Sequence, residues 1–308
     1  MRVKLEDVCE RGTSSLMQKD IVDKNGKYPV YGASGRIGSM ETYQQEHQTV
    51  AVVKDGAGIG RTMLLPEKSS IIGTMQYLIP KNCIEPEYLY YAVKYMHLEK
   101  YFSGATIPHI YFRDYKTEEF NLHNKTEQQE IISTLKRVEA VISNRREQLA
   151  MLDELVKARF VEMFGDPISN PFGFKVKTLQ KMIDDGTIMY HLDGNHGSDY
   201  PRNEEFVECG VPYISANCIV HNDVNLKLAK HLTEERASKL RKGIAQNGDV
   251  LFAHNATVGP VAILYTDDEK VILGTSLTAY RCDKERMVPD YLKAYMQSEG
   301  FVCQYTKD

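Results

Sequence analysis

The sequence lacks the features that would assign the protein to a membrane, secreted or metal-binding class. Its longest apolar runs, such as Val50 to Val53, have the length of a strand, whereas a membrane span needs roughly 18 residues. The amino-terminus has no apolar signal-peptide core, and the 6 cysteines include no Cys-x-x-Cys pair and no histidine at metal-ligand spacing. We therefore expect a cytoplasmic protein that does not enter a membrane, with buried thiols and no metal site.

The chain also has no excess of positive charge. It carries 38 Lys and Arg against 42 Asp and Glu, a formal net charge of -4 at pH 7. Proteins that bind nucleic acids usually show a basic excess or a clustered basic face, so composition alone does not indicate such binding. With 308 residues and 42% hydrophobic residues, the chain is long enough for two globular domains.

What the sequence does contain is an internal repeat, with a spacing of about 200 residues between the copies. Within a copy, short β-branched runs broken by Gly, Asn and Asp are typical of strands and tight turns, and a helix enters through Pro86. The predicted fold class is α+β, with two repeated mixed α/β domains and one long helix between them. The matching segments are 52–60 with 251–259, 71–74 with 272–275, and 86–89 with 289–292.

The long helix is predicted for residues 125–164, which contain no Pro and no Gly and are rich in good helix formers. Thr126, followed three residues later by Gln129, is typical of a capping box, and Gly165 to Pro167 is typical of a helix stop. At about 1.5 Å per residue, such a helix would be roughly 55 Å long. That length exceeds what a simple connection needs.

The apolar residues of this helix are spaced alternately by four and by three, and Arg145 occupies the one gap. A period of 3.5 residues is that of a coiled-coil seam. A helix that packs only on its own domain is the alternative, but the regular spacing favours a partner helix. The predicted helix interface consists of Ile131, Leu135, Val138, Ile142, Leu149, Leu152 and Val156.

Three segments resemble the specificity subunits of type I restriction-modification systems, in which two target-recognition domains are joined by long helical spacers. Residues Ser103 to Ile110 are similar to the segment that closes a recognition domain of this family. Residues Glu127 to Ile132 are similar to the opening of its spacer helix, and Phe160 to Pro167 to the exit into the second recognition domain. The order and spacing of these segments carry the resemblance over almost the whole chain.

The resemblance implies a first target-recognition domain at 1–123, a spacer helix that docks a methylase subunit at 124–165, and a second target-recognition domain at 166–308. The second copy ends at Asp308, before a counterpart of Thr106 to Ile110 and before a second spacer helix. In the family, as the resemblance implies, two spacers pair antiparallel. We therefore expect a truncated or recombined subunit whose helix pairs with another chain, a second copy of itself included.

The same resemblance implies a protein that is not an enzyme by itself. It would read a bipartite target in double-stranded DNA and direct methylase and restriction subunits to it, as part of a complex that methylates adenine. S-adenosylmethionine, ATP and Mg²⁺ would be cofactors of those partner subunits, and this chain would hold none.

Two segments suggest chemistry at first sight. Gly56 to Gly60 follows a predicted strand in the manner of a nucleotide-binding loop, but the next residues, Arg61 to Pro66, read as another strand where that loop needs a helix. Asn170 to Gly173 is similar to the catalytic loop of adenine methyltransferases, but it lacks the second Pro of that loop. We interpret both as turns, so no catalytic residue is predicted.

Candidates for DNA contact are polar residues in loops between predicted strands, which could reach base edges or phosphates. Because the loops of the two copies carry different donors and acceptors, they would read two unlike half-sites. The candidates are Arg36, Lys54, Arg61, His109, Tyr111 and Arg113 in the first copy, and Asn217, His254, Asn255, Thr257 and Ser276 in the second.

Three alternatives stay open at this stage. The chain could be the specificity subunit of a type II-like system, or a truncated or phase-variable remnant that only binds a methylase as a scaffold. A stand-alone methyltransferase is the third, and it would bind S-adenosylmethionine, for which the sequence offers no glycine loop.

Overall fold

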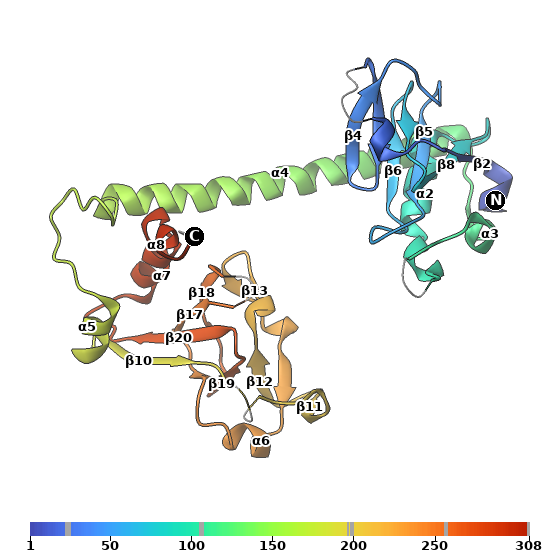
Figure 1. The fold of residues 1–308 in the computed structure, drawn as a ribbon. Coiled ribbons are helices and arrows are strands. Elements are labelled where there is room, and N and C mark those ends of the chain that lie inside the picture. The colour runs from blue at the N-terminus through green and yellow to red at the C-terminus, as the bar shows by residue number, and fades with distance from the viewer. Residues whose placement is uncertain (22–25, 105–107, 196, 198–199, 256–257, 307–308) are drawn as a thin grey trace. The chain divides into compact units, whose positions relative to one another are not determined.

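The computed structural model describes residues 1–308 except 22–25, 105–107, 196, 198–199, 256–257 and 307–308 (Figure 1). The chain forms two compact units, unit 1 (Met1–Arg146) and unit 2 (Glu147–Asp308). Each unit contains β-sheets and short helices, and the helix α4 (Lys125–Phe164) continues from one into the other. The predicted α+β class, with a long helix between two sheet-rich regions, is confirmed.

Unit 1 is built on a four-stranded antiparallel sheet with the strand order β2-β8-β5-β6. Its central strand β5 is rich in valine and buried at every position, because it pairs with both β6 and β8 and is covered by α2. Its elements are β1 (Arg2–Lys4), α1 (Leu5–Val8), β2 (Cys9–Thr13), β3 (Tyr28–Gly32), β4 (Gly35–Met40), β5 (Thr49–Val53), β6 (Thr62–Leu65), β7 (Ser70–Ile71), β8 (Met75–Pro80), α2 (Pro86–Tyr95), α3 (Phe112–Tyr115) and β9 (Glu119–Asn121).

Unit 2 repeats this plan in the sheet β10-β20-β17-β18, and both units also pair two strands in parallel, β3 with β7 and β12 with β19. Its strands are β10 (Ile188–Asp193), β11 (Phe206–Val207), β12 (Val211–Ile214), β13 (Ile219–Val220), β14 (Asp223–Val224), β15 (Lys230–Leu232), β16 (Ile244–Ala245), β17 (Val250–Ala253), β18 (Val261–Ile263), β19 (Val271–Leu273) and β20 (Leu277–Cys282). Its helices are α5 (Leu179–Asp184), α6 (Glu234–Ser238), α7 (Pro289–Gln297) and α8 (Glu299–Tyr305).

At the start of the first matching segment, the structure aligns the two copies one residue differently from the prediction. The N–H of Val53 donates to the carbonyl of Arg61, and the N–H of Ala253 donates in the same way to that of Pro260, both at 2.9 Å. Val53 therefore corresponds to Ala253, and Lys54 to His254. The prediction that paired 52–60 with 251–259 is wrong here, because the turn after β5 is one residue longer than the turn after β17.

The helix α4 has the predicted bounds, but its predicted cap is wrong. The Asn124 side chain accepts from the N–H of Glu127 at 3.0 Å, and the Glu127 carboxylate accepts from the N–H of Asn124 at 3.1 Å. This reciprocal pair is the capping box, two residues before the predicted Thr126. At the other end Gly165 has a φ of +75°, which favours glycine after a helix terminus.

The thiols divide evenly, so the prediction of buried cysteines is wrong for half of them. Cys9, Cys218 and Cys282 are buried, and burial raises the pKa of Cys9 to about 12. The other three, Cys83, Cys209 and Cys303, are exposed. Within the described residues, no group of three or more His, Cys, Asp or Glu could hold a metal ion, and no helix is long and apolar enough to span a membrane.

Candidate nucleic-acid interface

In unit 1, the turn after β5 is held by a segment more than 50 residues later in the chain. The N–H of Gly56 donates to the carbonyl of Pro108, and the N–H of Ile110 donates to the carbonyl of Lys54, both at 2.9 Å. These two bonds pair residues 54–56 with residues 108–110 in a short antiparallel ladder, which fixes the direction of the side chains on both segments. Of the predicted closing segment, residues 105–107 lie outside the described residues.

The ladder brings five side chains into contact, which we call the unit 1 row: Lys54, Asp55, His109, Tyr111 and Arg113. The Asp55 carboxylate accepts from Lys54 Nζ and lies 2.7 Å from His109 Nδ1. The His109 ring stacks on Tyr111 with the centroids 6.2 Å apart, and the Arg113 guanidinium lies 4.8 Å from the Tyr111 ring centroid. A cation on the face of an exposed aromatic ring is a suitable contact for a base or a phosphate.

Asp55 is the member of the row that was not predicted. It stands at the start of a glycine-rich turn, where a polar residue is common because of the turn itself, so nothing in the sequence marked it as a site residue. Its two bonds link a lysine and a histidine from distant parts of the sequence. Asp55 therefore positions the row and lowers its net positive charge.

The other two predicted residues of unit 1 lie outside the row. Arg61 donates to the carbonyl of Ala33 at 2.8 Å and so connects the β5–β6 turn to the β3–β4 turn. Arg36 is exposed on β4. Gly56 and Gly60 have φ values of +94° and +80°, and β6 follows them, which confirms the turn and excludes a nucleotide-binding loop followed by a helix.

Unit 2 brings together a different set of predicted residues. The N–H of His254 donates to the carbonyl of Ser276 at 3.1 Å, and the Ser276 hydroxyl accepts from the N–H of Ala216 at 3.2 Å. Ala216 begins the short turn that carries Asn217, so Ser276 connects the segments of Asn217 and His254. Asn255 is exposed next to them, and Thr257 lies outside the described residues.

Two side chains beside this set were not predicted. The Asp193 carboxylate at the end of β10 accepts from the Thr278 hydroxyl and lies 3.8 Å from His254 Nε2. Burial and the Asp193 charge raise the pKa of Tyr280. Where unit 1 presents lysine, arginine and stacked rings, unit 2 presents amides, a hydroxyl and one histidine, so the two surfaces offer different hydrogen-bonding groups.

The predicted helix interface divides into a part packed on unit 1 and a part exposed to solvent. Ile131 contacts the unit 1 core and Leu135 is half-buried, while Ile132, which the seam does not include, is buried. The remaining five have exposed fractions between 46% and 63%, an unusual exposure for aliphatic side chains on a helix. These exposed residues, which we call the α4 stripe, are Val138, Ile142, Leu149, Leu152 and Val156.

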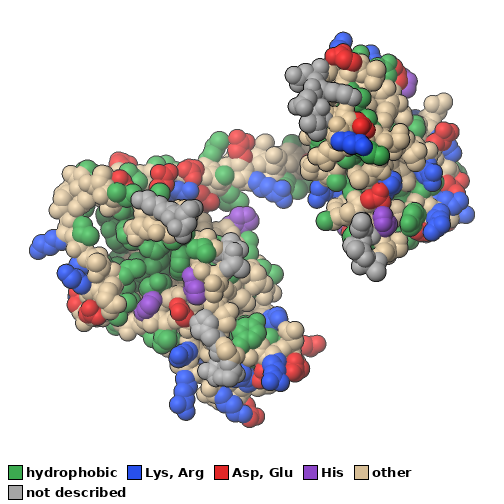
Figure 2. Space-filling model, in the orientation of Figure 1, with side chains coloured by type: hydrophobic (Ala, Val, Ile, Leu, Met, Phe, Trp, Pro, Cys, Tyr) green, Lys and Arg blue, Asp and Glu red, His purple; other side chains and the backbone are tan. Residues whose placement is uncertain are grey.

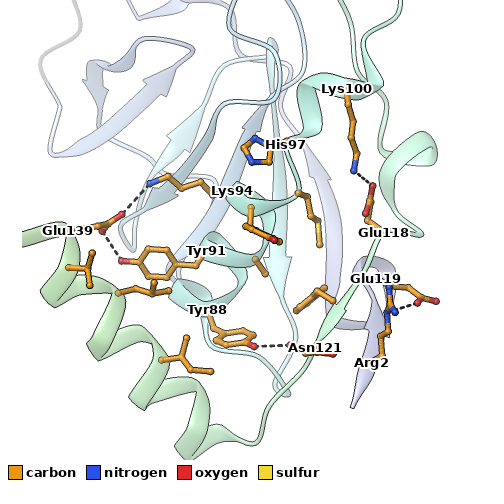
Figure 3. Close-up of a pocket in the computed structure, with 17 residues that line it drawn as sticks. Arg2, Tyr88, Tyr91, Lys94, His97, Lys100, Glu118, Glu119, Asn121 and Glu139 are labelled. Atoms are coloured by element: carbon orange, nitrogen blue, oxygen red, sulfur yellow. Dashed lines mark hydrogen bonds and ion pairs between the residues drawn. The ribbon is translucent and has the colours of Figure 1, made fainter. Parts of the chain in front are cut away.

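The start of α4 is fixed to α2 by polar contacts along an open groove of 1080 Å³ (Figure 3). Glu139 accepts from Tyr91 at 2.8 Å and from Lys94 at 3.2 Å, and these two donors lower the pKa of the Glu139 carboxyl. Below them, the Tyr88 hydroxyl donates to the carbonyl of Asn121 at 2.7 Å. The groove thus belongs to the surface that joins α4 to the rest of unit 1.

Comparisons with known proteins agree with the resemblance. Residues 1–152 match the family described as type I restriction modification DNA specificity domain. The specificity subunit of the type I restriction enzyme MjaIX from Methanocaldococcus jannaschii is 27% identical over 154 residues, which cover 46% of this chain and 36% of the relative. The match therefore spans about a third of that relative's length.

Two solved structures are similar to this chain, and the first of them has a related fold. The S subunit of a type I restriction-modification system from M. genitalium superposes with a TM-score of 0.50 at 18% identity, covering 100% of this chain and 79% of that one. A second, described as the structural basis of complex assembly and conformational transition of a type I R-M system, has a TM-score of 0.45 at 16% identity, with 98% and 79% covered. Over residues 1–152, the chain is thus similar to the family of type I restriction-modification DNA specificity domains.

Proposed function

We propose that this chain recognises DNA sequence for a type I restriction and adenine-methylation complex and catalyses no reaction itself. The observation that carries the proposal is the repeat of one fold with unlike side chains at equivalent positions. Lys54 of the unit 1 row corresponds to His254 in unit 2, and Asp55 corresponds to Asn255. Two related scaffolds with different donors and acceptors suit a bipartite target with two unlike half-sites.

The partners follow from the family and from the charge of the chain. Methylase and restriction subunits would supply the catalytic groups and hold S-adenosylmethionine, ATP and Mg²⁺. A net charge of -4 provides little general attraction to phosphates. We therefore expect the methylase subunits to supply much of the binding free energy, while the two recognition surfaces select the sequence.

The first test is co-expression with the methylase subunit encoded beside this chain, followed by purification through a tag on this chain and sequencing of methylated sites in host DNA. We expect co-purification and methylation at one split motif. Co-purification without methylation would favour the scaffold alternative. Absence of co-purification would contradict the methylase-docking role of α4.

The α4 stripe supports a second proposal, that α4 pairs with a helix from another chain, a second copy of this protein included. Aliphatic side chains at a 3.5-residue spacing are stabilised when a partner helix covers them. Sedimentation of the purified chain at micromolar concentration tests the second copy, and we expect a dimer that Leu149→Asp with Leu152→Asp converts to a monomer. A clean monomer of the unchanged chain would remove the self-pairing version of this proposal.

A further inference from the structure

Unit 2 carries an insertion where unit 1 has a two-residue turn. In each unit a strand, β3 or β12, lies between a parallel partner and an antiparallel partner. In unit 1 only Ala33 and Ser34 connect β3 to its antiparallel partner β4. In unit 2 the corresponding strands, β12 and β15, are separated by residues 215–229. The insertion is therefore a feature of one unit and not of the scaffold that both units share.

Both connections lie at the end of the unit that carries the candidate interface. In unit 1 the carbonyl of Ala33 accepts from Arg61, which belongs to the turn between β5 and β6. In unit 2 the N–H of Ala216, near the start of the insertion, donates to the hydroxyl of Ser276. The carbonyl of Ser276 accepts from the N–H of His254. The insertion thus begins on the same surface as His254.

The middle of the insertion is a hairpin that is fixed on the core of unit 2. Strand β13 pairs antiparallel with β14, and the two residues between them form the turn. Ile219 and Val224 pack against buried core residues of unit 2. At the base of the hairpin, the N–H of Asn225 donates to the carbonyl of Cys218 at 2.8 Å. A hairpin anchored in this way holds its turn in one orientation.

The turn of this hairpin carries two side chains at positions where glycine fits more easily. His221 and Asn222 have φ values of +49° and +61°, the left-handed backbone of a two-residue hairpin turn. Such turns favour glycine, and side chains held in this conformation gather at functional sites. Within the described residues, neither side chain has a hydrogen-bond or ion-pair partner, and His221 is exposed. Both are therefore available to a ligand.

The chemistry of the hairpin suits the edges of bases better than phosphates. Residues 219–224 include no Lys and no Arg, and Asp223 beside the turn is an exposed carboxylate, which phosphates repel. Figure 2 shows histidine side chains in the middle of the visible face of unit 2, where lysines and arginines are few. Amides and imidazoles carry both donors and acceptors. The major groove admits a two-stranded β-ribbon, and asparagine pairs there with N6 and N7 of adenine.

We propose that the β13–β14 hairpin enters the major groove and that His221 and Asn222 contact base edges of one half-site. Asn222 would accept from N6 and donate to N7 of an adenine, and His221 would contact a neighbouring base pair. This role rests on the proposed function and extends it, because it assigns sequence selection in unit 2 to one element. The two-residue turn of unit 1 forms no such hairpin, so unit 1 reads its half-site with other groups.

The experiment replaces both residues of the turn by glycine in the full chain and sequences the methylated sites in a host that also expresses the methylase subunit. Glycine adopts the left-handed backbone freely, so the melting temperature of the His221→Gly, Asn222→Gly variant should be unchanged or higher. We expect one half-site to lose discrimination by roughly 5- to 150-fold at each contacted base pair. The other half-site should keep its sequence.

Two further variants separate the side chains from the backbone. Asn222→Asp keeps the shape and tolerates the left-handed backbone but has no donor for N7, so it should relax an A·T position alone. The matched control is Lys68→Gly, because Lys68 has a φ of +54° in the connection between β6 and β7 of unit 1, at the far end of β6 from the β5–β6 turn. It should leave the motif unchanged.

The outcomes distinguish the hairpin from the recognition function itself. If the unchanged chain directs methylation to a split motif and the double glycine variant gives the same motif, the hairpin does not read bases, while the proposed function stands. Relaxation of both half-sites by that variant would also overturn the role, since weaker assembly would then be the cause. If the unchanged chain directs no methylation, the recognition function fails and the role of the hairpin fails with it.

Discussion

Replacement of Gln128 by alanine should destabilise unit 1 by about 3 kcal/mol, because it removes three hydrogen bonds from a fully buried position. The N–H of Glu85 and the carbonyls of Cys83 and His123 would be left without their partner. For a unit of this size, about 3 kcal/mol corresponds to a decrease in Tm of roughly 6–12 °C. Differential scanning calorimetry should show the shift in the unit 1 transition.

The neighbouring Gln129 provides a matched control. It is exposed on the same helix turn, so Gln129→Ala changes the same atoms and should alter the free energy of unfolding by less than about 0.5 kcal/mol. The transition of unit 2 should stay in place in both variants. Equal shifts for the two substitutions would show that Gln128 does not hold α4 on α2.

The elements that the sequence predicted well are those with a long periodic signal. The absence of Pro and Gly over residues 125–164 defines α4 at both ends. The capping box was predicted at the wrong residue because two pairs have the sequence pattern of a cap, Asn124 with Glu127 and Thr126 with Gln129. Asn124 is used as the cap because β9 and the bond from the Leu122 N–H to the Met1 carbonyl, at 2.7 Å, fix the chain just before it.

The seam along α4 was predicted from spacing, but spacing does not reveal which face a neighbouring domain covers. At the start of the helix the buried residues are Gln128 and Ile132, and Ile132 lies one position after Ile131, with which the predicted seam begins. One residue turns a helix by 100°, so α2 packs on the flank of the seam. A hydrophobic pattern also cannot predict a fully buried glutamine, because the burial of its side chain depends on hydrogen bonds to backbone groups of other segments.

The candidate site was predicted as a set of polar loop residues, without their grouping. Lys54 and His109 meet because the segment 108–110 pairs with 54–56, a contact between residues more than 50 positions apart. Nothing local in the sequence encodes that pairing. The same limit explains why Asp55 and Asp193, which act through such contacts, were missed.

Substitutions in the two units should change different halves of the methylated motif. Arg113 is exposed on the Tyr111 ring in unit 1, and Asn255 is exposed after β17 in unit 2. Arginine and asparagine both make paired hydrogen bonds to base edges, and loss of such a pair costs about 1–3 kcal/mol of discrimination. Arg113→Ala should therefore relax one position of one half-site by roughly 5- to 150-fold, and Asn255→Ala one position of the other.

The measurement is the sequence of methylated sites in a host that expresses each variant with the methylase. Arg2→Ala is the control for charge, since Arg2 is exposed on β1 in an ion pair with Glu119 and lies outside the unit 1 row. It should leave the motif unchanged. If Arg113→Ala and Asn255→Ala relaxed the sequence specificity of the same half-site, the two units would not recognise separate half-sites. The duplicated fold would then have a role in assembly and not in recognition. If each substitution relaxed the sequence specificity of a different half-site, each surface would be assigned to its own half-site. The reason is that a side chain in contact with one base pair does not discriminate at a base pair that it does not touch.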